Sequence, residues 1–384
     1  MLRGVALLGI FVMNVPGFSH SLFTPPPVPD GSLDSKMVFL RELLFAGKFN
    51  LVFGALFGVG FSLQLGRLAA ARGEGGATLV YARRLAVLLA IGLVHAALLW
   101  SGDVLLVYAA LGFVLLAVRR LPDAAIATIV VACLAFPAAS DAARPWLFSV
   151  ETETVAAFEY QQFEAADDIA YGHGSFADAV AETTRIFAWL ATTPLGQFTY
   201  LSFAVQMATG ILLGFMVGRR RWMERLPELR GPLRRLHAAS LVLAVLAGLA
   251  WWLLGGVAGE AAGETGLAAG FARTIGRAAL ATFYAVTVLR LLELPWAERL
   301  LRPFAYAGRM PLSNYLGQTL LASFVFYGWG LGWWGRTSPL AELLLPLGLF
   351  LVVQLPLSAF WLSRFRFGPV EYVWRRLTYG KLRA

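Results

Sequence analysis

The chain has 384 residues, of which 58% are hydrophobic and only 14% are charged. A soluble globular protein carries about a quarter charged residues, so this composition excludes an ordinary soluble enzyme. The net charge of +9 lies in short loops between apolar runs, which argues against a basic face for nucleic acid.

Apolar runs of bilayer length recur along the whole chain, and a spanning helix needs roughly 20 mostly apolar residues. We therefore expect an all-α, polytopic membrane helical bundle of about ten transmembrane helices, forming a single membrane domain over residues 1–384. The expected spans are 2–19, 46–66, 83–101, 103–120, 122–139, 195–218, 237–256, 267–292, 310–332 and 340–363. The first run resembles a signal peptide, but no small-residue cleavage site follows, so we interpret it as a retained helix.

The direction of the helices follows from the basic residues, which are enriched on cytoplasmic loops. Arginines cluster after the second expected helix, at 67–84, and after the sixth, at 219–235. Placing both clusters inside also puts both termini in the cytoplasm of a bacterial inner membrane. The acidic stretch 140–194 then falls outside, where we expect an extracytoplasmic loop or a small helical cap.

Two arginines are expected inside the eighth span, at Arg273 and Arg277, one helical turn apart. A charge in the middle of a membrane costs about 2.5 to 3.5 kcal/mol on insertion scales, so each needs a partner or a wet cavity. One interpretation is a cationic pocket for a phosphate or carboxylate group. The other is a structural ion pair with Asp103 or Glu260.

His95 lies near the outer end of the third span, and a tight turn brings Asp103 back toward it. A neutral imidazole is a general base near physiological pH, and a carboxylate beside it orients the ring. The alternative is a histidine satisfied by a backbone carbonyl or a hydroxyl group. Histidines and carboxylates do not cluster with metal-ligand spacing, so no metal site is expected.

Arg3 and Asn14 are eleven residues apart on the first helix, which places them on nearly the same face and roughly 16 Å apart. Asn14 either polarises a substrate carbonyl or hydrogen-bonds a neighbouring helix. Asn314 and Gln318, one turn apart in the ninth span, indicate a polar interior.

Several stretches resemble the YeiB-like family of bacterial membrane proteins, whose shared domain is the domain of unknown function 418. They are LRGVALLGIFVMNVP at 2–16, GKFNLVFGALFGVGFSLQ at 47–64, GLVHAALLWSGDVLLVYAALG at 92–112, GRMPLSNYLGQTLLASFVFYGWGLGWWG at 308–335 and FGPVEYVWRRLTYGK at 367–381.

The resemblance implies a relation to the transmembrane acyltransferase clan. Such enzymes move an acyl group from a cytoplasmic donor, typically acetyl-CoA, to an acceptor across the membrane. The polysaccharide enzymes of the clan carry an Arg, ten residues and then a His in the first helix. Here that spacing runs from Arg3 to Asn14, and an amide is no general base. The resemblance therefore leaves His95 or His20 for this role, and we favour His95.

The leading hypothesis is a membrane acyltransferase in which His95 is the base, Asp103 orients it and Asn14 polarises the acyl carbonyl. The residues expected to bind anionic or polar parts of the donor or acceptor are Arg273, Arg277, Arg3, Asn314 and Gln318. Acetyl-CoA or another acyl-CoA is expected as a substrate, with no permanently bound cofactor. The expected partners are the lipid bilayer and an extracytoplasmic glycan or small-molecule acceptor.

Two other functions are compatible with the same residues. A transporter or flippase of an anionic substrate would use the buried arginine pair and the histidine, although no internal repeat typical of transporters is evident. A membrane partner protein without catalytic activity is the third alternative.

Overall fold

The protein, described by a computed structural model, is helical wherever it forms regular structure. The structure describes residues 1–24, 28–29, 31–256 and 263–380, and none of these residues forms a strand. The all-α class expected from the sequence is confirmed. Glu260, one expected partner of the arginine pair, lies outside the described residues.

The helices follow the expected apolar segments closely, with additional helices between them. In chain order they are α1 (Leu2–Asn14), α2 (Pro16–Ser19), α3 (Leu33–Leu44), α4 (Lys48–Leu98), α5 (Leu105–Val118), α6 (Asp123–Leu147), α7 (Val150–Ala170), α8 (Phe176–Thr192), α9 (Pro194–Arg219), the 3₁₀ turn η1 (Trp222–Glu224), α10 (Arg230–Leu253), α12 (Gly263–Leu291), α13 (Pro295–Arg309), α14 (Pro311–Phe326), α15 (Pro339–Gly348), the π-helical segment η2 (Leu349–Gln354), α16 (Leu355–Arg364) and α17 (Pro369–Tyr379).

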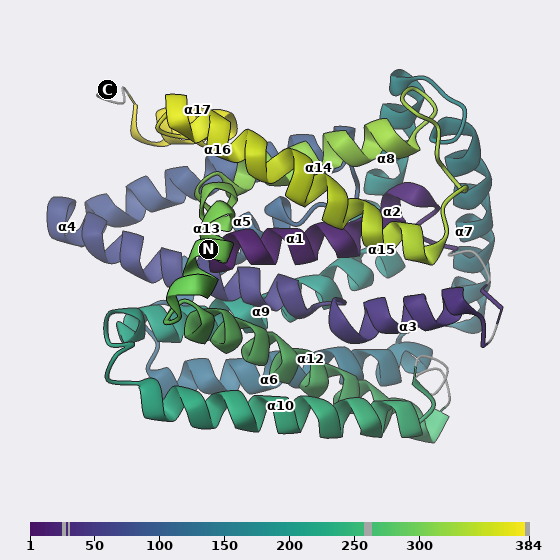
Figure 1. Ribbon diagram of the computed structural model, residues 1–384. Helices are drawn as coiled ribbons and strands as arrows, with labels where there is room; N and C mark the ends of the chain where they lie inside the picture. Colours follow the sequence, from purple (N-terminus) through teal and green to yellow (C-terminus); the bar gives the residue numbers. More distant parts are fainter. Residues whose placement is uncertain (25–27, 30, 257–262, 381–384) are drawn as a thin grey trace.

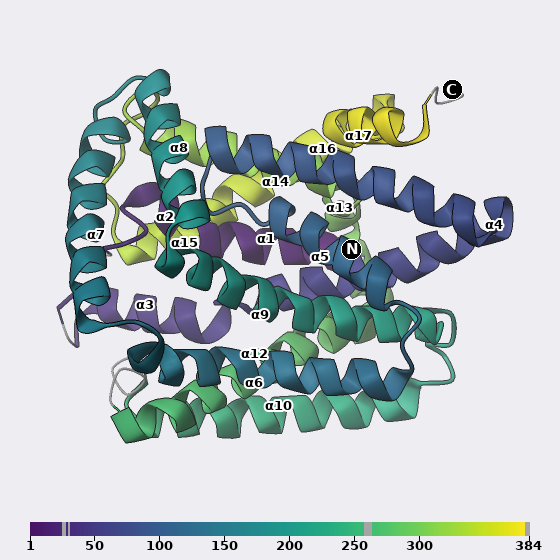
Figure 2. The same ribbon diagram turned by 180° about the vertical axis from the view of Figure 1, so that it is seen from behind.

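Most long helices run side by side along one direction, whereas α7 and α8 form a pair across one end of the bundle (Figures 1 and 2). We call this end the cap end. The first residue of α1, the last turn of α17 and the segment between α9 and α10 lie toward the other end, which we call the termini end (Figure 1). The bundle therefore has two chemically different ends, one with the acidic helix α7 and one with the arginine-rich segment 219–235.

The second and third expected spans are the two arms of one bent helix, α4. The bend is at Gly73, whose φ of 72° and ψ of 167° are not helical. Glycine adopts a positive φ without the steric penalty that other residues incur, so the chain bends at Gly73 and then continues as a helix. The arms fold back on each other, and the bend projects from the termini end (Figure 1).

Small residues let the first arm of α4 approach α9 closely. A Cβ atom added to Gly58 would lie 2.0 Å from the carbonyl oxygen of Ile211, and one added to Gly214 would lie 1.9 Å from that of Ala55. Membrane helices associate mainly through such close packing, because lipid tails are as apolar as the side chains. This contact fixes the first arm, which forms one wall of the candidate site.

Within the described part of the chain, five helical segments are long and apolar enough to cross a membrane, namely Leu33–Leu98, Asp123–Leu147, Pro194–Arg219, Arg230–Leu253 and Pro339–Arg364. A sixth is the pair Gly266–Leu291 and Pro295–Arg309, which is bent by 115°. Leu2–Asn14 and Leu105–Val118 are shorter apolar helices. These segments agree with a membrane protein of several spans, while the number of ten and the cytoplasmic placement of the termini stay predictions.

The cap helices are tied to the loop that follows α14. The indole Nε1 of Trp334 donates to Oδ1 of Asp168 at 2.7 Å, and the backbone N–H of Gly328 donates to the carbonyl oxygen of Tyr171 at 2.7 Å. The rings of Tyr171 and Tyr327 stack with their centroids 4.5 Å apart. α14 therefore connects the cap end to the middle of the bundle.

Candidate functional site

Three buried polar side chains meet between α4, the start of α5 and α14. His95 Nδ1 lies 2.7 Å from Asp103 Oδ1, and His95 Nε2 lies 2.9 Å from Thr319 Oγ1. The three residues are 1%, 1% and 2% exposed. The sequence placed His95 and Asp103 together, and the structure joins them to a hydroxyl that the sequence did not single out.

Local structure explains why Asp103 faces the histidine. α4 ends after Leu98, a short turn reverses the chain, and Asp103 Oδ2 accepts a hydrogen bond from the backbone N–H of Leu106 at 2.6 Å. The carboxylate thus accepts from a backbone N–H in the first turn of α5 with one oxygen and binds the imidazole with the other. An ionised Asp103 accepts the Nδ1–H of a neutral ring, which leaves the lone pair of Nε2 facing Thr319.

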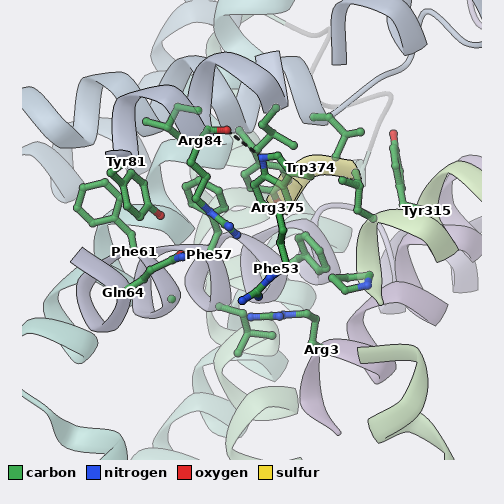
Figure 3. Close-up of a pocket in the computed structure, with 18 of the residues that line it drawn as sticks. Arg3, Phe53, Phe57, Phe61, Gln64, Tyr81, Arg84, Tyr315, Trp374 and Arg375 are labelled. Atoms are coloured by element: carbon green, nitrogen blue, oxygen red, sulfur yellow. Dashed lines mark hydrogen bonds between the residues drawn. The ribbon is translucent and has the colours of Figure 1, made fainter. Parts of the chain in front are cut away.

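A cavity of ≈ 710 Å³ lies close to these residues (Figure 3). It lies between α1, both arms of α4, α5, α14 and α17. At one side it reaches the exposed side chain of Arg67, and at the other it ends on the buried residues Val104, Leu105 and Tyr315. The cavity therefore runs from the surface into the interior of the bundle.

Four arginines line this cavity, and its described lining includes no carboxylate. They are Arg3 of α1, Arg67 and Arg84 of α4 and Arg375 of α17. Figure 3 shows Arg3, Arg84 and Arg375 extending into the same space from three different helices. Like charges gathered in this way repel one another, so an anion between them is stabilising.

The arginines near α17 are held in defined positions. The guanidinium of Arg84 lies 3.6 Å from the ring centroid of Trp374, and the indole Nε1 donates to the backbone oxygen of Arg84 at 2.9 Å (Figure 3). Arg375 stacks on Phe367 at 4.3 Å, and its Nε is a buried donor without a hydrogen-bond partner. Arginine presents a planar fork of donors that matches phosphate, so this arrangement suits a phosphorylated ligand.

The deeper wall of the cavity is apolar. It is formed mainly by the side chains of Phe53, Phe57, Phe61, Leu85, Leu88, Leu105 and Tyr108. A ligand that fits this cavity is amphiphilic, with anionic groups at the arginines and an uncharged chain in the interior.

The deep end of the cavity points toward His95. Leu88 lines the cavity, and His95 follows seven residues later on the same face of α4, about 10 Å along the axis. Tyr315 lines the cavity on α14, and Thr319 follows one turn later. The Tyr315 and His95 ring centroids are 5.3 Å apart, so a single aromatic side chain lies between the cavity and the histidine.

The arginine pair of the sequence hypothesis lies elsewhere. Arg273 forms an ion pair with Asp141 at 3.0 Å, and Arg277 lies 3.8 Å from Glu42. Both line a separate cavity of only ≈ 40 Å³ and are absent from the lining of the large one. This geometry agrees with the interpretation of the two arginines as members of structural ion pairs. Their partners are Asp141 and Glu42, whereas Asp103 binds His95.

The remaining expected residues divide between the cavity and the helix contacts. Arg3 lines the cavity, whereas Asn14 is half-buried at the end of α1 and is not part of the cavity lining. Asn314 Nδ2 donates to Ser358 Oγ at 3.0 Å, and Gln318 Nε2 donates to Gln354 Oε1 at 3.1 Å. These buried amides join α14 to the segment η2–α16 and do not line the cavity.

Comparison with known proteins places the chain in a family. The family model described as "Protein of unknown function (DUF418)" matches residues 217–381. "Uncharacterized protein YxaH" of Bacillus subtilis (strain 168) is 30% identical over 397 residues, which cover 99% of this chain and 93% of the relative. The chain belongs to the DUF418 family. The resemblance seen in its motifs is thereby confirmed.

Other relatives extend over nearly the whole chain as well. "Uncharacterized 39.9 kDa protein in amylase 3'region" of Bacillus acidopullulyticus is 33% identical, covering 99% of this chain and 92% of the relative. "Uncharacterized protein YeiB" of Escherichia coli (strain K12) is 27% identical, covering 98% of this chain and 94% of the relative. No solved structure matches. The DUF418 segment carries Tyr315, Thr319 and Arg375, while His95 and Asp103 precede it.

Proposed function

We propose that the protein is a membrane acyltransferase that binds an acyl-CoA-type donor in the arginine-lined cavity and uses His95 as general base. The observation that carries this proposal is the direction of the cavity. It begins among arginines, continues along an apolar wall and ends one side chain away from a hydrogen-bonded His95–Asp103 pair.

The chemical groups of an acyl-CoA follow one another in the same order as the surroundings along this cavity. Its phosphates are anionic, its arm is long and flexible, and its reactive thioester lies far from the charges. Arg84 and His95 are eleven residues apart on one helical arm, about 16 Å along the axis. A donor with phosphates at Arg84 and Arg375 therefore needs such an arm for its thioester to approach the histidine.

His95 and Asp103 would then divide the acid–base work. Asp103 holds the Nδ1–H, so the lone pair of Nε2 can take a proton from an attacking hydroxyl group. The imidazolium that forms is stabilised by the same carboxylate, in a site from which water is excluded by burial. The acceptor is a hydroxyl or amine of a glycan or small molecule that arrives from the cap end.

The proposed orientation puts the termini end in the cytoplasm of a bacterial inner membrane. The arginine-rich segment 219–235 and the mouth of the cavity near Arg67 lie on that side, as the positive-inside rule requires. Acyl-CoA is a cytoplasmic metabolite, so this orientation supplies the donor to the open side of the cavity.

Calorimetry on the full chain in nanodiscs tests the donor site, with acetyl-CoA as the probe. Arg375→Gln should weaken binding at least tenfold, because it removes a charge-assisted contact to phosphate. Arg273→Gln is the matched control, since this arginine lies outside the cavity. Equal affinities of the wild type and Arg375→Gln would contradict the donor site.

A thiol reagent that detects free CoA tests the chemistry. The wild type should release CoA slowly without an acceptor, and His95→Gln should abolish this release while it leaves donor binding unchanged. A cavity open at one end also suits a transporter of an anionic substrate. Uptake of labelled substrate into proteoliposomes without any acyl donor would favour that function instead.

A further inference from the structure

Thr319 occupies the position from which His95 would accept a proton. Its Oγ1 lies 2.9 Å from His95 Nε2, and Asp103 Oδ1 lies 2.7 Å from the other ring nitrogen, Nδ1. All three side chains are at most 2% exposed. An external hydroxyl group would have to displace Thr319 before His95 could act on it directly.

The order of hydrogen bonds is hydroxyl, imidazole, carboxylate, which is the arrangement that activates a nucleophilic hydroxyl group in unrelated hydrolases. Geometry and roles, and not sequence position, identify such a triad. A threonine that only satisfied a buried histidine would show the same two distances, so the position of Thr319 relative to the substrates has to distinguish the two roles.

That position lies between two spaces on opposite sides of the histidine. Tyr315, one turn before Thr319 on α14, lines the arginine cavity. Ser323, one turn after it, lines a small pocket of ≈ 10 Å³ at the cap end, together with Phe176 and Val180 of α8. Residues four apart share a helix face, so Tyr315, Thr319 and Ser323 form one row that runs from the donor side to the cap side.

We propose that Thr319 is the nucleophile that receives the acyl group from the donor and holds it as an ester until the acceptor arrives. This inference rests on the proposed function, because it assigns the step that follows donor binding. A covalent carrier in the middle of the row allows donor and acceptor to react in turn from opposite ends, without meeting in one cavity.

In the first step, Thr319 Oγ1 attacks the thioester carbonyl while its proton moves to His95 Nε2. The C–S bond breaks, and the CoA thiolate leaves with the proton from His95. In the second step, the acceptor hydroxyl attacks the Thr319 ester and gives its proton to His95. The acceptor ester forms, and the proton returns to Thr319 Oγ1. No oxidant or reductant is needed.

An exchange reaction without acceptor tests the covalent step. Purified protein is incubated with acetyl-CoA and isotopically labelled CoA, and labelled acetyl-CoA is measured. Exchange requires that the acetyl group stays on the protein while one CoA leaves and another enters. We expect exchange in the wild type and in Thr319→Ser, and an acetyl adduct on the peptide that contains residue 319 after an acid quench.

Thr319→Val keeps the shape of the side chain but removes the hydroxyl, so exchange should fall by about 100-fold or more. Thr209→Val is the matched control, because Thr209 is also 2% exposed but lies on α9 away from the triad. Thermal unfolding of each variant establishes that it folds. If Thr319→Val does not fold, the adduct in Thr319→Ser is the second test, because an acetyl adduct outside the peptide that contains residue 319 would overturn the carrier.

The two proposals fail in different ways. If the wild type binds no donor and releases no CoA, both the proposed function and the proposed acyl ester on Thr319 are refuted. If Thr319→Val still transfers acetyl groups to an acceptor at the wild-type rate, or if the adduct is found on His95, the carrier is overturned while the acyltransferase remains.

Discussion

Asp103→Asn is the substitution that tests the proton chemistry with the least change in shape. Asp103 binds two partners, His95 Nδ1 at 2.7 Å and the backbone N–H of Leu106 at 2.6 Å. An asparagine retains one oxygen for Leu106 and presents its NH₂ group to the imidazole. The ring then carries its proton on Nε2 and donates to Thr319 instead of accepting from it.

The change of tautomer determines the expected loss of activity. The wrong tautomer leaves the triad in place but removes the base, which costs about 10⁴-fold in comparable triads. The free energy of unfolding should fall by only about 1–3 kcal/mol, because one charge-assisted hydrogen bond is weakened. Activity should therefore be lost in protein that remains folded and still binds acetyl-CoA.

The assay is CoA release at saturating acetyl-CoA, paired with thermal unfolding of the same preparation. Asp168→Asn is the control, because this carboxylate accepts from Trp334 in the cap and is not part of the triad. An Asp103→Asn variant that released CoA within tenfold of the wild-type rate would refute the assignment of His95 as base.

Three other predictions concern the cavity, the helix packing and the cap. Arg375→Gln should reduce the dependence of acetyl-CoA affinity on salt, as seen by calorimetry at two ionic strengths, because it removes one phosphate contact. An unchanged salt dependence would exclude a contact between Arg375 and the donor. Gly58→Ala should lower the free energy of unfolding by roughly 1–3 kcal/mol, since its Cβ would lie 2.0 Å from Ile211 O, whereas Gly75→Ala meets nothing within 4 Å. Equal melting temperatures of these two variants would contradict the packing. Burial raises the pKa of Asp167 in α7 to about 7 from an ordinary 3.8, so the cap should lose stability as pH rises from about 4 to 7. Hydrogen exchange of α7 should show this loss, and Asp167→Asn should remove it; a cap that becomes more stable over that range would contradict the buried, protonated acid.

The parts of the site that sequence reasoning found are local in the chain. His95 and Asp103 are eight residues apart and separated by a tight turn, so the distance between them follows from local geometry. The helices were found for a similar reason, because each apolar run has to satisfy its own backbone hydrogen bonds. The continuous helix through Gly73 was not predicted, because two separate spans were expected and the structure joins them in one bent helix.

The parts that sequence reasoning missed depend on contacts between distant segments. Arg84 and Arg375 are 291 residues apart, and only the packing of α17 beside α4 brings them to one cavity. In the sequence, Arg67 and Arg84 were interpreted only as markers of the cytoplasmic side. Their position in the lining of the large cavity was therefore not predicted. Thr319 carries no signal of its own, because a hydroxyl in an apolar helix usually bonds the preceding turn.

Arg273 and Arg277 are the case in which the sequence left two interpretations open. Their charge inside an apolar run suggested either a binding site or a structural ion pair, and the acids beside them, Asp141 and Glu42, come from segments that the sequence could not place beside α12. Buried charge indicates that a partner exists, but whether this partner is a ligand or a side chain depends on tertiary packing.

The most direct test of the proposed donor site is a structure of the full chain, in nanodiscs, with a non-hydrolysable thioether analogue of acetyl-CoA. We expect density in the ≈ 710 Å³ cavity, with phosphates at Arg84 and Arg375 and the acyl end beside Tyr315, directed at His95 and Thr319. Density for the analogue at any other place, with this cavity empty, would contradict it.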